Sequence, residues 1–337
     1  MMPPAAPIAA GSGAETVRFE PPRLNVCVLG GTGFVGTELV SQLAAAGHWV
    51  RVPTRAVSHG RHLSVLPTVE LVTADVHDRR ALSDVLAGMD AAVNLVGILN
   101  SSGGARFRDV HVGLAAKLIE EARTARVARL LHMSAVGADA KRAPSRYLRS
   151  KGEAEALVRA AQPSLDVTIF RPSVIFGSGD SLTQRFTRLL KLAGGWLPLV
   201  RPRARFAPVY VGDVARGFVR ALDDRSTIGR TYELCGPEVL TLEQIVRASA
   251  AAAAVPCRIV RLPDFLGRLQ GLALGLLPGK PFTLDNFRSL TIECLCAEDG
   301  LRALGIEPQR LAAVLPSYLG HLTEPDQLNR FRAEVER

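Results

Sequence analysis

The sequence predicts an α/β protein built on a doubly wound parallel sheet, with a smaller, mostly helical C-terminal subdomain. Over residues 24–172, short apolar runs of β-forming residues alternate with segments of helical periodicity. This is the pattern of a parallel sheet covered by helices on both faces. A glycine-rich turn, Gly30 to Gly36, joins the first apolar run to the first helical segment. Beyond Pro172 the alternation breaks down, and Gly, Pro and Arg become dense over residues 177–208.

Each element is expected from its local pattern. Apolar β-prone runs predict six strands, at residues 24–29, 49–52, 69–72, 91–96, 129–133 and 167–170. Periodic apolar positions between them predict four helices, at residues 34–46, 79–87, 110–125 and 146–161. A helix near 211–222 and a strand at 231–234 are expected to return to the sheet, and the remainder is expected to be mostly helical.

The glycine turn predicts a dinucleotide-binding site. In Gly30-Gly31-Thr32-Gly33-Phe34-Val35-Gly36, one glycine permits a tight turn, another lets the backbone approach a pyrophosphate, and a third lets the helix pack close to the strand. The helix N-terminus then offers free N–H groups and a positive dipole end to the anion. The chain is therefore expected to carry the Rossmann arrangement of strand, glycines and helix.

These elements suggest a division of the chain. Residues 1–22 lack both a cationic start and a continuous apolar stretch, so they predict a disordered tail and not a signal peptide. Residues 23–175 are expected to form the dinucleotide-binding domain, to which 209–236 return. The segments 176–208 and 237–330 are expected to form a subdomain for substrate or partner, over the carboxyl ends of the strands.

The composition favours a globular protein, with 47% hydrophobic and 22% charged residues and no apolar run as long as a membrane span. The net charge is +9, but the cationic residues are spread without aromatic interleaving, which argues against nucleic acid. Peripheral contact with acidic lipid at the inner face of a membrane, or with an acidic partner, stays open. The cysteines are odd in number and scattered, which predicts a reduced, cytoplasmic protein. They are Cys27, Cys235, Cys257, Cys294 and Cys296. No His, Cys and acid cluster predicts a metal site.

The end of the second strand predicts the choice of cofactor. An acid there would hydrogen-bond the ribose 2′-hydroxyl of NAD(H), and this chain has no acid before Glu70. Arg55 is placed to bind a 2′-phosphate, with Arg51 or Arg61 in support and Thr54 as a hydrogen-bond donor. NADP(H) is therefore expected in preference to NAD(H), and the alternative interpretation is that the arginines are solvated loop residues.

Asp75, just past the third strand, has two interpretations. Its carboxylate is placed to meet the adenine edge, with Val76 supplying backbone groups. It is equally placed to cap the helix that begins near Asp78.

A tyrosine and a lysine four residues apart predict acid–base chemistry. Tyr147 and Lys151 share one face of the expected fourth helix. A nearby ammonium would lower the tyrosine pKa from about 10, giving a group that moves a proton at a carbonyl oxygen. Ser134, at the end of the fifth strand, is placed to hydrogen-bond a substrate oxygen or to cap its loop. His132 is expected to be a packed histidine, and Ser145 a helix cap.

Taken together, these motifs resemble those of the extended and atypical short-chain dehydrogenase/reductases, which are NAD(P)-dependent epimerase/dehydratase-like proteins. The segments that carry the resemblance are Gly30-x-x-Gly33-x-x-Gly36, Asn94-Leu95-Val96-Gly97, Ser134, Tyr147-x-x-x-Lys151 and Arg171-Pro172-Ser173-x-x-Phe176-Gly177. The segments 147–155 and 206–215 resemble bacterial relatives of the nucleotide-binding accessory subunit of respiratory complex I, alpha-subcomplex subunit nine. The likeness covers about residues 24–320.

The resemblance implies a site for NADP(H). It implies that Arg55 contacts the 2′-phosphate, that Lys151 contacts the nicotinamide ribose, and that Pro172 and Ser173 lie beside the nicotinamide. The cofactor-binding residues it implies are Gly30, Thr32, Gly33, Phe34, Val35, Gly36, Arg55, Asp75, Val76, Asn94, Val96, Gly97, Lys151, Pro172 and Ser173. The short spacing from Ser134 to Tyr147 disfavours nucleotide-sugar substrates.

Two function classes follow. The first is an oxidoreductase acting on a carbonyl, alcohol or quinone-related substrate, with Ser134, Tyr147 and Lys151 as its catalytic residues. The second is a non-catalytic NADPH-binding accessory or assembly protein associated with a respiratory complex. The apolar segment 265–277 can lie at a membrane interface, line an apolar pocket or form an ordinary core helix. We favour the enzyme, because nucleotide binding alone does not require Ser134 and Tyr147 together.

Overall fold

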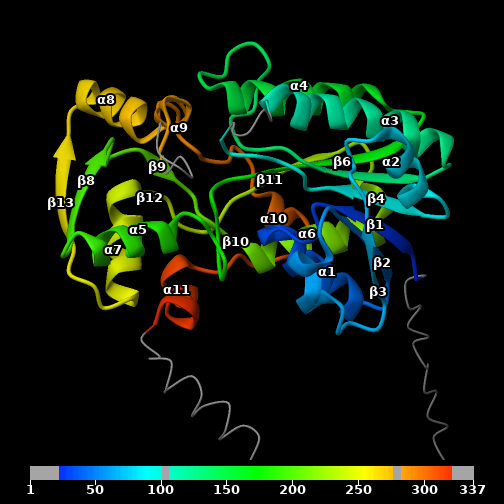
Figure 1. The fold of residues 1–337 in the computed structure, drawn as a ribbon, viewed down its shortest axis with the longest axis horizontal. Helices are drawn as coiled ribbons and strands as arrows, with labels where there is room; N and C mark the ends of the chain where they lie inside the picture. The colour runs from blue at the N-terminus through cyan, green and yellow to red at the C-terminus, as the bar shows by residue number, and fades with distance from the viewer. Residues whose placement is uncertain (1–22, 101–105, 276–281, 321–337) are drawn as a thin grey trace, which may run out of the picture.

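The computed structural model describes residues 23–100, 106–275 and 282–320, so the expected tail at 1–22 lies outside the described residues. Within them, seven parallel strands form one central sheet (Figure 1). They are β1 (Asn25–Leu29), β2 (Trp49–Thr54), β3 (Val69–Thr73), β4 (Ala91–Asn94), β5 (Arg129–Met133), β6 (Asp166–Pro172) and β11 (Thr231–Leu234). Their order is β11-β6-β5-β4-β1-β2-β3. This order confirms the doubly wound Rossmann sheet, whose direction of winding reverses between β1 and β4.

Helices cover both faces of this sheet (Figure 1). One face carries α1 (Phe34–Ala45) and α6 (Val211–Asp223), and the other carries α2 (Arg79–Leu86), α3 (Leu114–Thr124) and α4 (Arg146–Ala160). Three short helical turns are η1 (Val57–Leu63), η2 (Asp109–Gly113) and η3 (Arg225–Thr227). The expected helix at 110–125 is thus divided into the π-helical turn η2 and α3, and the other elements lie close to where the sequence predicts them.

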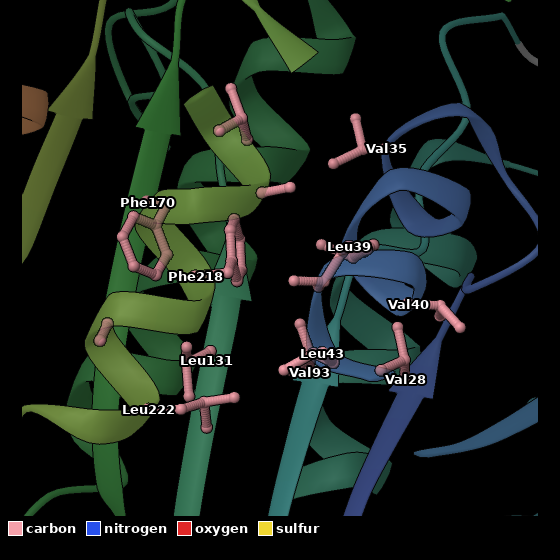
Figure 2. Packing of buried hydrophobic residues seen from close by; sticks show 14 of the residues in the cluster. Val28, Val35, Leu39, Val40, Leu43, Val93, Leu131, Phe170, Phe218 and Leu222 are labelled. Carbon is pink, nitrogen blue, oxygen red and sulfur yellow. The ribbon is translucent and has the colours of Figure 1, made fainter. Parts of the chain in front are cut away.

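The strands alternate their side chains between two apolar layers. Val26 and Val28 face α1 and α6, whereas Cys27 and Leu29 face α2, α3 and α4. In the first layer, Phe218 of α6 packs against Phe170 of β6 with ring centroids 4.2 Å apart (Figure 2). Both phenyl groups are fully buried. This packing holds α6 on the sheet and brings the chain back to β11.

The rest of the described chain forms smaller strands and further helices. The strands are β7 (Ile175–Phe176), β8 (Trp196–Val200), β9 (Arg205–Phe206), β10 (Val209–Tyr210), β12 (Leu240–Thr241) and β13 (Arg258–Leu262). The helices are α5 (Thr183–Leu192), α7 (Leu242–Ala252), α8 (Asp264–Gly275), α9 (Leu284–Ser289), α10 (Gly300–Ala303) and α11 (Leu311–Leu319).

A separate apolar cluster joins α5, α7, α11 and β8. We propose that it is the core of a subdomain built from residues 176–208 and 237–330, so far as these are described. One part behaves differently, because α10 packs against α6 and β11 in the core of the central sheet. Among the described helices, none is both long enough and apolar enough to span a bilayer.

The Phe170–Phe218 pair allows a test of this packing. We expect Phe218→Ala to lower the free energy of unfolding by about 3–5 kcal/mol, because it leaves a cavity between α6 and the sheet. Urea unfolding followed by circular dichroism measures this change. Val65→Ala, at a side chain that is 80% exposed, is the matched control and should change stability by less than about 0.5 kcal/mol. Equal effects of the two substitutions would contradict the packing.

Candidate functional site

β1 ends in a turn that only glycine can form. Gly30 has φ +80°, and a Cβ at Gly36 would lie 2.2 Å from the carbonyl oxygen of Gly30. The bare backbone at Gly36 therefore lets α1 begin directly against the turn. Gly33 differs, because it is exposed and a Cβ there would meet only the Gly30 oxygen, at 3.2 Å. The space beside Gly33 is open, and this space fits a pyrophosphate.

The N-terminus of α1 faces this open space without a competing acceptor. Its N-cap, Gly33, offers no side chain, and the first turn holds no acid. The free N–H groups and the positive end of the helix dipole therefore favour an anion. The neighbouring side chains have different surroundings: Val35 is buried in the core, Phe34 lines the cavity described below, and Thr32 packs close to Gly60 of η1.

The region after β2 leaves two of the three expected arginines exposed, whereas the third is paired with an acid. Arg55 is exposed directly after β2, and Arg61 is exposed in η1. The Arg51 Nε instead donates to Oε2 of Glu70, on the neighbouring strand, at 2.8 Å. The prediction that Arg51 supports Arg55 is therefore wrong, and Arg61 is the remaining alternative. The Thr54 hydroxyl donates to the carbonyl oxygen of Ala56 at 3.0 Å, so its proton is used within the loop.

At the end of β3, the structure assigns the helix cap to Asp78, and the predicted adenine contact of Asp75 stays a prediction. Asp78, not Asp75, is the N-cap of α2 and accepts from the N–H of Ala81 at 2.9 Å. Asp75 accepts from the N–H of His77 at 3.0 Å, which fixes a tight turn. Val76 packs partly against the core beneath. The Asp75 carboxylate stays at the sheet edge where ligands bind.

The end of β4 approaches the tyrosine–lysine pair. Asn94 is buried, accepts from the N–H of Val96 at 3.2 Å and lies 3.3 Å from His132 Nδ1. Gly97 follows, and a Cβ there would lie 3.2 Å from Lys151 Nζ. The glycine therefore lets the backbone after β4 pass directly over the lysine.

Ser134, Tyr147 and Lys151 meet between β5 and α4. Lys151 is buried, and its Nζ donates to the carbonyl oxygen of Met133 at 3.0 Å. Ser134 follows Met133, and its buried hydroxyl faces the Glu155 side chain on α4. Tyr147 lies one turn before Lys151 on α4, where Ser145 is the helix cap, as predicted. Ser134 and Tyr147 both line the cavity described below, where a tyrosine phenol can serve as a proton donor.

Burial, and not the lysine, controls the protonation of this group. Burial raises the pKa of Tyr147 to about 12, with a smaller contribution from Cys294. The expectation that Lys151 lowers the tyrosine pKa is therefore wrong. Burial also lowers the pKa of Lys151 to about 8 and that of His132 to about 3. Tyr147 is thus a neutral phenol near pH 7, able to donate a proton, and His132 is a neutral packed histidine.

The end of β6 forms the opposite wall. Pro172 and Ser173 both line the cavity, and the Ser173 hydroxyl donates to the carbonyl oxygen of Cys294 at 2.8 Å. The carbonyl oxygen of Cys294 also accepts from the N–H of Ala207 at 3.1 Å. These bonds hold the segment 290–297, which we call the roof segment, over the carboxyl ends of the strands.

The roof segment also corrects the interpretation of the cysteines. Cys235, directly after β11, forms a disulfide with Cys296. The expectation that all five cysteines stay reduced is therefore wrong for this pair, which the sequence separation of 61 residues gave no reason to join. Cys27, Cys257 and Cys294 are free thiols. Within the described residues, no cluster of His, Cys, Asp or Glu could hold a metal ion.

A large apolar cavity opens above the tyrosine. Its volume is about 740 Å³, and Ser134, Tyr147, Pro172 and Ser173 lie on its wall. Most of the remaining wall is apolar, from α5, β8, α8 and the roof segment. The charged residues on the wall are Arg185 and Glu293. This wall suits an apolar ligand better than a charged one.

The tyrosine is positioned by two residues that the sequence analysis did not single out. Asp285 of α9 accepts from the N–H groups of Arg146 and Tyr147 at 2.8 and 3.1 Å, and so caps α4 from a distant segment. The His111 ring lies 5.7 Å from the Tyr147 ring, edge to face, and its Nδ1 is 2.8 Å from Ser150 Oγ. Thr283-x-x-Asn286 signals the start of α9, but no local pattern shows where α9 docks.

Residues 26–235 match the NAD dependent epimerase/dehydratase family. The chain belongs to this family. Alpha subcomplex subunit 9 of mitochondrial NADH dehydrogenase [ubiquinone] 1 from Arabidopsis thaliana is 32% identical over 84% of this chain and 74% of that protein. The mouse protein of the same name is 29% identical, again over 84% of this chain. A ceramide reductase from Caulobacter vibrioides is 32% identical over 71% of this chain and 74% of the relative.

Solved structures share the fold. An epimerase from Methanothermobacter thermautotrophicus superposes with a TM-score of 0.72 at 19% identity, over 92% of this chain and 95% of that one. The dTDP-glucose 4,6-dehydratase DesIV from Streptomyces venezuelae, solved with NAD bound, superposes with a TM-score of 0.69 at 23% identity, over 88% of this chain and 96% of that one. Both confirm the Rossmann fold.

The open space beside Gly33 leads to a first prediction for the site. Gly33→Val should abolish NADPH binding without unfolding the sheet, because the added side chain fills the space that fits a pyrophosphate. Calorimetric titration measures binding, and circular dichroism checks the fold. Gly88→Val is the control for adding a branched side chain, since a Cβ there meets nothing, although its φ of +73° adds strain. Undiminished binding in folded Gly33→Val would remove the glycine turn from the site.

Arg55 leads to a second prediction. Arg55→Ala should weaken NADPH binding about tenfold or more and leave NADH binding nearly unchanged, because an arginine–phosphate contact contributes about 1.5–3 kcal/mol. Arg51→Ala is the matched control, since that guanidinium is paired with Glu70. Parallel titrations with both cofactors decide the matter, and equal losses for NADPH and NADH would show that Arg55 does not contact the 2′-phosphate.

The buried ammonium leads to a third prediction, on pH. The pKa of Lys151 falls from 10.5 to about 8 on folding, so between these values the unfolded chain holds the proton more tightly. The free energy of unfolding should therefore gain a contribution from Lys151 as the pH rises through this window. Urea unfolding of the wild type and of Lys151→Met, at about pH 7 and about pH 10, isolates that contribution. The same pH dependence in both proteins would contradict it.

Proposed function

We propose that this protein is an NAD(P)H-dependent oxidoreductase that acts on an apolar carbonyl or alcohol, with quinone-related compounds among the candidates. One observation carries the proposal: Tyr147 and Ser134 both line a large, mainly apolar cavity. The cavity lies at the carboxyl ends of the strands, next to the glycine turn. A ligand in it would meet the phenol of Tyr147 on a mainly apolar wall.

The protonation state of Tyr147 favours reduction of a carbonyl over oxidation of an alcohol. A reduced dinucleotide, when bound, would supply hydride to the carbonyl carbon. The phenol of Tyr147, kept neutral by burial, then gives its proton to the carbonyl oxygen as the C–O double bond becomes single. Ser134 donates a hydrogen bond to the same oxygen and so orients it. A solvent proton then restores the phenol, and the buried Lys151 is proposed to bind the nicotinamide ribose.

NADP(H) is the proposed cofactor, with NAD(H) as the weaker ligand. Support comes from Arg55 and Arg61, which are exposed near the glycine turn, and from the lack of an acid at the end of β2. The solved dehydratase DesIV holds NAD. The choice between the two cofactors is therefore a property to be tested on this chain.

A second function is supported by the comparisons. Several relatives are named as subunits of mitochondrial NADH dehydrogenase, or complex I. We therefore keep the alternative that this chain binds NADPH as an accessory or assembly subunit of a respiratory complex, peripheral to the inner face of a membrane. In that case the nucleotide would stabilise the fold, and Tyr147 would not need to transfer a proton.

Tyr147→Phe separates the two functions. In an enzyme this variant should keep NADPH affinity and lose about 10²–10⁴ of the turnover, because only the proton donor is removed. Anaerobic oxidation of NADPH with long-chain aldehydes and short-chain quinone analogues measures turnover. Tyr232→Phe, which removes a hydroxyl outside the cavity, is the matched control.

Complementation of a deletion strain completes the test. An enzyme requires both Gly33 and Tyr147, so neither Gly33→Val nor Tyr147→Phe should restore the phenotype. A binding subunit requires the nucleotide alone, so Tyr147→Phe should rescue fully while Gly33→Val fails. Full rescue by Tyr147→Phe would overturn the catalytic proposal even though the three residues lie together.

A further inference from the structure

Helix α8 exposes its large apolar side chains, which a helix on a water-exposed surface normally buries. Phe265, Leu269 and Leu272 share one face, at helical spacing, and are 69%, 60% and 57% exposed. The buried positions of α8 are Gly267 and Gly271, which let it lie close to β8 and α9. An ordinary surface helix buries its large apolar residues and exposes polar ones. The outer face of α8 is therefore built to contact something apolar.

The exposed apolar surface continues onto the elements around β8. Trp196 of β8 is 51% exposed, and Val260 of the paired strand β13 is 42% exposed. Leu189 and Leu192 of α5, which contacts β8, are exposed as well. We call the exposed apolar residues of α5, β8, β13 and α8 the apolar patch. Figure 1 shows these four elements gathered at one end of the molecule. A concentration of this kind marks an interaction surface.

The charge of these four elements is one-sided. They contain six cationic side chains, of which Arg261 is paired with Glu243 of α7 at 3.1 Å, and a single acid, Asp264, which is paired with Arg201 at 2.6 Å. The cationic residues are Arg185, Arg188, Lys191, Arg258, Arg261 and Arg268. The Arg258 guanidinium lies 5.3 Å from the centre of the Trp196 ring. Tryptophan and cationic residues around aliphatic side chains match the boundary between lipid headgroups and acyl chains.

The patch is continuous with the cavity. Leu189 and Trp196 belong to both, since each lines the cavity and is exposed. On α8, Gln270 and Leu274 line the cavity while the outer face carries the patch. An apolar ligand leaving a bilayer at this surface would therefore reach Tyr147 without crossing water.

We propose that α8, β13, β8 and the end of α5 dock on an anionic lipid bilayer and open the cavity toward it. The docking itself does not depend on catalysis. Only the assignment of the cavity to a lipid-borne carbonyl rests on the proposed function. Insertion of the apolar side chains supplies the hydrophobic part of the affinity, and the cationic side chains supply the preference for acidic headgroups.

Flotation of the full-length protein with vesicles tests the proposal. Binding should be firm to phosphatidylcholine vesicles that contain phosphatidylglycerol, weaker to phosphatidylcholine alone, and reduced by added salt. Phe265→Ser with Leu269→Ser should lower the affinity at least tenfold, about what loss of two inserted side chains produces. Val65→Ser with Val239→Ser, at exposed apolar residues outside the patch, is the matched control and should bind as the wild type does.

The charge is tested in the same way. Arg188→Glu and Arg268→Glu should each weaken binding to the acidic vesicles about fivefold or more, and the control Arg80→Glu should not. No binding to acidic vesicles would overturn the proposal, as would equal losses in patch and control variants. Binding only to native membranes that retain their proteins would instead assign the patch to a protein partner. NADPH titration of the same preparations keeps the two proposals apart, because vesicle binding without NADPH binding would contradict the proposed function alone.

Discussion

The closeness of α1 to the first strand is the constraint on which the site depends. It exists because Gly36 has no side chain, so the helix begins against the carbonyl oxygen of Gly30. That contact fixes where the helix dipole points and leaves open space beside Gly33. The ends of β4, β5 and β6 then lie around the same point because parallel strands end at one edge of the sheet. Asn94, Ser134 and Pro172 reach the site in this way, from three separate parts of the sequence.

Much of this arrangement could be predicted because it is local. A few consecutive residues determine each local feature: the glycine turn, the strand ends and the Tyr147–Lys151 spacing. The parallel sheet then sets their relative positions. The helix cap at Ser145 and the packed His132 follow from the same local rules. The family likeness rests on these residues, so sequence and structure agree most closely here.

The errors have physical causes that act over a distance. The sequence cannot show that Glu70 on the neighbouring strand pairs with Arg51, because register decides this. It cannot show that burial outweighs Lys151 at the tyrosine, because the roof segment and α9 supply the burial from the far end of the chain. The Cys235–Cys296 pair is of the same kind, since only the folded chain brings the end of β11 beneath the roof segment.

The cap that Asp285 places on α4 affects the order in which the protein matures. Tyr147 emerges from the ribosome 138 residues before the carboxylate that orients its helix. By then the nascent chain contains most of the strands of the central sheet. A partly synthesised chain can therefore hold these strands before Asp285 fixes the position of Tyr147. The site is therefore completed late in synthesis, when the segment that carries Asp285 packs against α4. We expect a truncated or nicked chain to keep the glycine turn and yet to lack an organised site, so nucleotide binding alone is a poor measure of an intact protein.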